Sequence, residues 1–140
     1  MNWRLIFQLS LFGLAMGVAT VFIIPSTIEP FFWLAIFIAS AWMIATHTPG
    51  RYFLHGLLVG ISNSIWITAV HVALFSAYAD RHAREVAMMG QMGLPAHPRL
   101  MTALMGPASG IVSGIIIGLL ALLASRLVKR RAVAAPAGAA

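Results

Sequence analysis

The chain has 140 residues, of which 61% are hydrophobic and 9% are charged, and its mean hydropathy is +0.93. A soluble domain carries about 25% charged residues, so this composition excludes an ordinary water-soluble fold. The absence of cysteine excludes disulfides, thiolate catalysis and cysteine-based metal sites. The net charge of +6 does not indicate nucleic-acid binding, because four of the basic residues directly follow an apolar run.

The first predicted element is an apolar helix over residues 5–24, which ends before Pro25. Its length matches the ~20 residues that cross a hydrocarbon core. A cleaved signal peptide is the alternative, since the start is basic and Gly17 and Ala19 are small enough for a cleavage site. The apolar run continues through "VFII", beyond the length of a usual signal core, which favours a membrane span.

The second span is predicted over residues 31–48 and the third over residues 52–78. Pro30 suits the first turn of a helix and Pro49 ends one, so the two prolines bracket the second span. Residues 80–89 also have a helical pattern and would continue the third helix beyond the membrane.

The third predicted span carries an unusual number of polar residues. Ser64, Thr68 and His71 share one helical face, and Asn63 lies close to it. Ionisable groups within a span usually face the bundle interior or a water-filled cavity. Two interpretations stay open: a polar path in which His71 carries protons, or side chains that bond neighbouring helices. The four predicted spans contain no Asp or Glu to complete a proton relay, which weakens the first.

The segment between the third and fourth spans contains thioether and imidazole groups, which suit Cu(I). The candidate Cu(I) ligands are Met88, Met92 and His97. Met88 and Met92 are also explained as a hydrophobic stripe on one helical face. A zinc site built from His82, Glu85 and His97 lacks the spacing that fixes the geometry of such sites.

Glycine recurs at every fourth residue of the fourth predicted span, over residues 101–128. In lipid, helices associate through close packing and hydrogen bonds, and a face of small residues lets a neighbouring backbone approach. The glycines are Gly106, Gly110, Gly114 and Gly118 in the fourth span, Gly13 and Gly17 in the first, and Gly56 and Gly60 in the third. The pattern is compatible with packing inside one four-helix bundle and with a homodimer seam along the fourth helix.

Basic residues near helix ends favour the cytoplasmic side of a membrane. In a four-span arrangement, Arg4, Arg51 and a basic cluster lie on one side, whereas Arg81, Arg84 and Arg99 lie on the other. The cluster comprises Arg126, Lys129, Arg130 and Arg131, where a helix meets anionic lipid headgroups. The distribution predicts that both termini are cytoplasmic.

The stretch "EVAMMGQMGLPAHPRLM", followed by "GPASGIVSGIIIGLLA", resembles the corresponding region of uncharacterised small bacterial membrane proteins with four predicted spans. The similarity extends over most of the chain, to about residue 128. This resemblance implies a multi-pass protein of the bacterial inner membrane, and it supplies no catalytic or ligand-binding residues.

The sequence therefore predicts an all-α integral membrane bundle of four transmembrane helices over residues 1–128, followed by a basic end and disordered tail over residues 129–140. The function expected is non-catalytic, through helix packing as a homo-oligomer or an accessory subunit. A small transporter or channel lined by the third helix is the alternative. We expect membrane lipids and a homodimer or larger membrane complex as partners, with no enzyme activity, cofactor or nucleic acid.

Overall fold

The computed structural model describes residues 1–91 and 97–134, with side chains up to residue 128. Within this part of the chain, all regular secondary structure is helical, which confirms the predicted all-α class. The helices are α1 (Trp3–Phe22), α2 (Glu29–His47), α3 (Tyr52–Ala73), α4 (Phe75–Arg81), α5 (Ala83–Gln91) and α6 (Pro98–Ala134).

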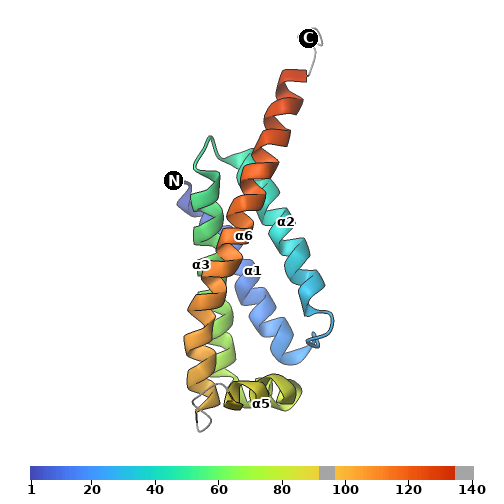
Figure 1. The fold of residues 1–140 in the computed structure, drawn as a ribbon, viewed down its shortest axis with the longest axis vertical. Helices are drawn as coiled ribbons and strands as arrows, with labels where there is room; N and C mark the ends of the chain where they lie inside the picture. The colour runs from blue at the N-terminus through green and yellow to red at the C-terminus, as the bar shows by residue number, and fades with distance from the viewer. Residues whose placement is uncertain (92–96, 135–140) are drawn as a thin grey trace.

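Four of the described helices are long and apolar enough to cross a membrane: α1, α2, α3 and the part of α6 over Pro98–Val128. This confirms the predicted spans in number and fits a multi-pass membrane protein. The helix α6 has 37 residues, so it is about 55 Å long. Its C-terminal turns project beyond the other helices (Figure 1).

The helix ends follow from local chemistry. The side-chain oxygen of Asn2 accepts a hydrogen bond from the Leu5 N–H at 3.1 Å and caps α1. Pro30 lies in the first turn of α2, and Thr48 is extended where α2 ends before a proline. Among the described non-glycine residues, only Arg51 has a positive φ, of 54°. This left-handed residue turns the chain sharply between α2 and α3.

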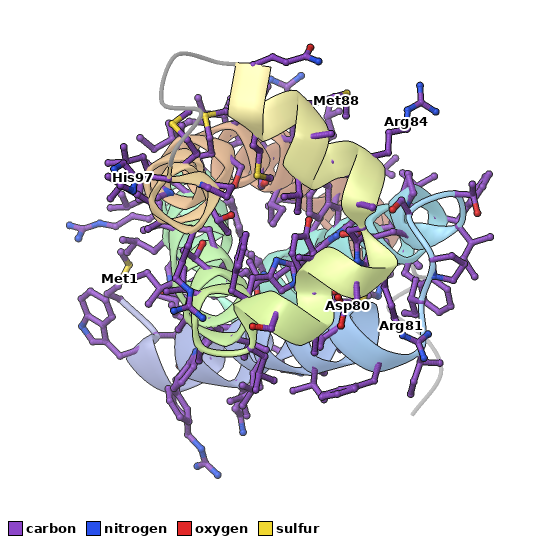
Figure 2. The ribbon with its side chains drawn as sticks, turned by 90° about the horizontal axis from the view of Figure 1, so that it is seen from below. Met1, Asp80, Arg81, Arg84, Met88 and His97 are labelled. Atoms are coloured by element: carbon purple, nitrogen blue, oxygen red, sulfur yellow. The ribbon has the colours of Figure 1, made fainter. Side chains whose placement is uncertain are left out.

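The structure corrects the predicted third span, because α3 ends at Ala73 and not at residue 78. The backbone of Leu74 leaves the helical region, with φ −103° and ψ 32°, and the chain turns into α4. Residues 80–89 therefore do not continue α3. The helices α4 and α5 instead lie across one end of the bundle (Figures 1 and 2).

The helix α3 lies at the centre of the bundle, with α1 packed on one side and α6 on another. The helix α2 packs mainly against α6, and it does so through its C-terminal half. Its buried residues are Ser40, Ala41, Ile44 and Ala45. Toward Glu29, α2 leans away from the other helices (Figure 1). The bundle is thus closed at one end of α2 and open at the other.

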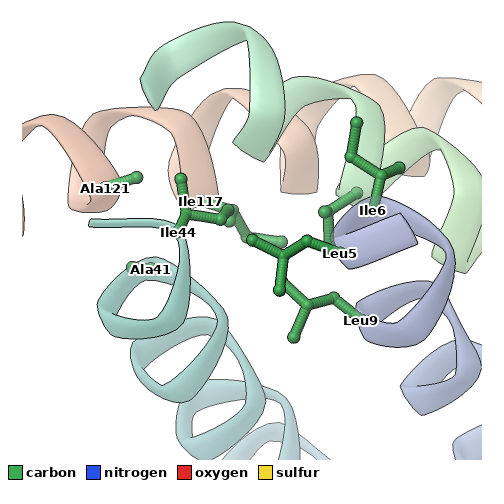
Figure 3. Packing of buried hydrophobic residues seen from close by; sticks show 8 residues of the cluster. Leu5, Ile6, Leu9, Ala41, Ile44, Ile117 and Ala121 are labelled. Carbon is green, nitrogen blue, oxygen red and sulfur yellow. The ribbon is translucent and has the colours of Figure 1, made fainter. Parts of the chain in front are cut away.

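The closed end holds the main apolar core, to which all four long helices contribute (Figure 3). Its buried members are Leu5, Ile6 and Leu9 from α1, Ala41 and Ile44 from α2, Val59 from α3, and Ile117 and Ala121 from α6. Ile44, Val59 and Ile117 are fully buried. This contact anchors the C-terminal half of α2 and leaves its N-terminal half without a comparable core.

Candidate functional site

The four glycines of α6 lie against α3 of the same chain. A Cβ atom added at Gly114 would lie 2.6 Å from the Leu57 carbonyl oxygen and 3.0 Å from its Cα atom, which is too close for any side chain. The contact pairs are Gly106 with Thr68, Gly110 with Ser64, Gly114 with Leu57 and Gly118 with Phe53. The glycines thus let the two backbones approach along a continuous line.

The glycines of α1 and α3 also lie at helix contacts. Gly56 and Gly60 of α3 face the glycines of α6, whereas Gly13 and Gly17 of α1 face α3. An added Cβ at Gly17 would lie 3.1 Å from the Ile67 Cα atom. A homodimer seam along the glycines of α6 would therefore require α3 to move away.

Two of the polar side chains of α3 are directed toward α1. The Asn63 Oδ1 atom accepts a hydrogen bond from the backbone N–H of Gly13 at 2.7 Å. The His71 Nε2 atom lies 2.8 Å from the Thr20 hydroxyl oxygen. Both residues therefore join α3 to α1, at points about two helical turns apart.

The other two polar side chains of α3 contact α6. Ser64 packs against Gly110 and Thr68 packs against Gly106. The structure thus divides the four residues of the predicted polar path between two neighbouring helices. The four do not line one cavity among the described residues: Asn63 and Ser64 line a cavity of about 640 Å³, Ser64 and Thr68 line another, and His71 lines neither.

Three rings form a stack where α3 gives way to α4. The ring of Tyr78 lies 4.3 Å from that of His71 and 4.4 Å from that of His82. Burial raises the pKa of Tyr78 to about 12, and the carboxylates of Glu29 and Glu85 act in the same direction. His82 is buried, and its Nε2 atom has no hydrogen-bond partner among the described residues.

The sequence does not reveal this stack, because residues 71 and 78 would lie about 10 Å apart along a continuous helix and come into contact only through the break at Leu74. The spacing of residues 71, 78 and 82 is a helical i, i+7, i+11 pattern, which signals a shared face. Glu85 joins the same end of the molecule: its carboxylate accepts a hydrogen bond from Ser26, and this bond lowers its pKa. The contact ties α5 to the connection between α1 and α2.

The open end of α2 borders a cavity of about 640 Å³, here called the lateral crevice. It lies between the N-terminal half of α2 and the paired helices α3 and α6. Its polar wall residues are Ser26, Glu29, Asn63, Ser64, Ser109 and Ser113. The aromatic part of the wall is formed by Trp33 and Phe37, whose ring centroids lie 5.9 Å apart. The Trp33 indole N–H donates a hydrogen bond to the Glu29 carboxylate at 3.0 Å.

Asn63 is the most constrained polar group of the lateral crevice. Its side chain is only 3% exposed, and its Oδ1 atom is occupied by Gly13. Its Nδ2 atom is buried and has no hydrogen-bond partner among the described residues. A buried amide donor without a partner is rare in folded proteins.

The remaining predicted site residues lie at the two ends of the molecule. Arg126 is exposed on α6, and the side chains of Lys129, Arg130 and Arg131 lie outside the described part. Met88 and His97 are exposed and lie on separate sides of the α4–α5 end (Figure 2), whereas Met92 lies outside the described residues. No group of three His, Asp or Glu residues in the described part is placed to hold a metal ion. The copper hypothesis stays a prediction.

The chain was compared with protein-family models, with curated proteins and with solved structures, and none of the three comparisons found a match. Function is therefore inferred from the residues of the candidate sites and their geometry.

Proposed function

We propose that this chain is a non-catalytic integral membrane protein that acts through helix packing, as a homo-oligomer or as an accessory subunit of a membrane complex. The observation that supports this proposal is that the polar residues of α3 contact neighbouring helices. Asn63 and His71 bond α1, while Ser64 and Thr68 pack on glycines of α6. Polar groups used in this way act as contacts between helices, which is their common role in membranes.

The alternative function, a transporter or channel, receives less support from the same geometry. A path along α3 would need its polar residues to face one continuous cavity. The lateral crevice includes Asn63 and Ser64, but His71 is bonded to Thr20 and stacked on Tyr78. A proton or solute would have to pass between residues that face different helices.

We further propose a bacterial inner-membrane location with both termini in the cytoplasm. The start of α1 and the C-terminal end of α6 lie at the same end of the bundle (Figure 1). That end carries Arg4, Arg51 and the basic cluster that begins at Arg126. An excess of basic residues beside membrane helices favours retention on the cytoplasmic side.

Native mass spectrometry of the protein released directly from its own membrane tests the proposed function. We expect a dimer, a larger homo-oligomer or a complex with another membrane protein, in addition to bound lipid. A chain that leaves the membrane only as a monomer, at every expression level, would contradict the proposal. Solute flux into proteoliposomes that is lost in His71→Ala but not in Thr46→Ala would support the transporter instead; Thr46 is exposed at the far end of α2.

A further inference from the structure

A continuous groove runs between α3 and the first half of α6. It consists of two cavities, of about 630 and 570 Å³, which share Val72 and Ala103 as wall residues. We propose that this α3–α6 groove binds one anionic phospholipid, with the headgroup phosphate at Arg99 and one acyl chain along the two helices. The inference goes beyond the proposed function and does not depend on it.

The first cavity carries the positive charge of the groove, because Arg99 and His97 line it. The guanidinium carbon of Arg99 lies over the Phe75 ring, 5.5 Å from its centroid. A guanidinium that stacks through its face keeps its N–H donors at its edge, where they bind two oxygens of a phosphate. Among the described residues, no hydrogen bond or ion pair occupies these donors.

The charges of the groove favour an anionic lipid over a zwitterionic one. No Asp or Glu is among the described residues that line either cavity. The ammonium of a zwitterionic headgroup would therefore find no partner there, and it would bring a like charge close to Arg99. The headgroup of phosphatidylglycerol brings only a negative charge, and basic pockets between membrane helices bind such headgroups.

The second cavity provides the wall for an acyl chain. Its wall is aliphatic except for Ser64 and Thr68, whose side chains pack against glycines of α6. Ile65 is 61% exposed and Ile111 is 50% exposed, so this part of the groove opens to the hydrocarbon region.

The length of the groove matches one leaflet of a bilayer. From Arg99 to Ile111, α6 rises by roughly 18 Å, whereas half of the hydrocarbon core is ~15 Å thick. Arg99 is the second residue of α6, and Ile111 lies near the middle of its membrane-crossing part. A phospholipid whose phosphate lies at the helix start therefore reaches the end of the groove with its acyl chain.

Photolabelling of the purified full chain in nanodiscs of phosphatidylcholine tests the assignment. One probe is phosphatidylglycerol with a diazirine in the middle of an acyl chain, and the matched probe is phosphatidylcholine with the same chains. We expect the anionic probe to label peptides from residues 61–72 and 103–111 about fivefold more than the zwitterionic probe, because one basic residue favours an anionic lipid to about this extent.

Two arginine variants test the headgroup contact. Arg99→Gln should bring labelling by the two probes to within about twofold of each other, because it removes the charge that distinguishes them. Arg84→Gln is the matched control and should leave the difference unchanged. Arg84 lines neither cavity, is directed outward, and lies on the other side of the α4–α5 end from His97 (Figure 2).

Two alanine variants test the position of the acyl chain. Ala69→Phe fills the second cavity and should lower labelling by the anionic probe about fivefold or more. Ala108→Phe, on α6 and outside the walls of both cavities, should leave labelling unchanged. All four substituted positions are exposed, and circular dichroism checks that each variant folds.

Three results would overturn the inference. Equal labelling of the wild-type chain by the two probes would show an ordinary lipid boundary without a site. Equal effects of Arg99→Gln and Arg84→Gln would show that the guanidinium does not hold the phosphate. Groove peptides that stay unlabelled because a second copy of the chain covers them would identify a protein contact instead, and this result would support the proposed function.

Discussion

Tyr78 shows how a single side chain can hold one end of the bundle together. Its ring lies between those of His71, at the end of α3, and His82, where α4 meets α5. Only 7% of the residue is exposed. The stack therefore brings the chain back under the bundle after the break at Leu74, and it places a buried phenol beside two carboxylates.

This environment predicts a loss of stability at alkaline pH. Because burial raises the pKa of Tyr78 from 10.0 to about 12, the unfolded chain loses the phenolic proton before the folded chain does. The stabilisation is complete below pH 10 and is lost as the pH rises toward 12. We expect Tyr78→Phe to keep the ring stack but to lack the titrating phenol. At about pH 11 the variant should therefore lose less unfolding free energy than the wild-type chain, by on the order of 1 kcal/mol.

Thermal unfolding in detergent at about pH 8 and about pH 11 measures the effect. Tyr52→Phe, a tyrosine at the opposite end of the bundle, is the matched control. If the wild-type chain and Tyr78→Phe lose equal stability between the two conditions, the phenol is not protected in the folded state.

The packing of α6 on α3 is the contact on which the bundle most depends. Glycine costs about 1 kcal/mol relative to alanine in a helix in water, so a row of four would weaken α6 if it served no contact. Each of the four lies where an added methyl group would collide with α3. The cost in helix propensity is offset because close packing replaces the hydrophobic effect as the force between helices in lipid.

Gly114→Ala is expected to destabilise the bundle by about 1–3 kcal/mol, because its methyl group would overlap the Leu57 carbonyl. Gly90→Ala in α5 is the matched control, since an added Cβ at Gly90 has no neighbour within 4 Å. The control should be neutral, or more stable by up to about 1 kcal/mol. Unfolding in micelles by titration with SDS, followed by circular dichroism, compares the two. Similar behaviour of both variants would show that α6 does not depend on its glycine face.

The molecule as a whole has two unlike ends. One end holds the apolar core, the start of α1 and the projecting turns of α6 (Figure 1). The other end holds α4 and α5, with Arg84 directed outward (Figure 2). The three acidic residues, Glu29, Asp80 and Glu85, also belong to this second end.

The proposed orientation places this second end outside the cell. Because the chain has no cysteine, single cysteines can report it directly. Thr27, just before α2, and His47, its last residue, are exposed positions at opposite ends of that helix, and replacing either by Cys removes no Asp, Glu, Lys or Arg. We expect a membrane-impermeant maleimide to label Thr27→Cys in intact spheroplasts and His47→Cys only after lysis. The opposite pattern would reverse the orientation.

The predictions that succeeded concern properties carried by short stretches of sequence. Apolar runs of helical length indicated the spans, and Pro30 and Pro49 marked the ends of α2 within about two residues. The predicted third helix ran past its true end because nothing in "VALFSAY" marks a break. At Leu74 the backbone leaves the helical region, and the residues that follow return under the bundle, where Tyr78 stacks on His71.

What the sequence alone determined, then, is the number of membrane-crossing helices and the faces on which glycine permits close approach, because hydropathy and helical spacing are local properties. What only the tertiary structure decided is which helix uses each face. Asn63 and Ser64 are neighbours in sequence, yet one bonds α1 and the other packs on α6. The lateral crevice likewise exists because α2 is anchored at one end by Ile44 and leans away at the other, and no local pattern specifies that angle.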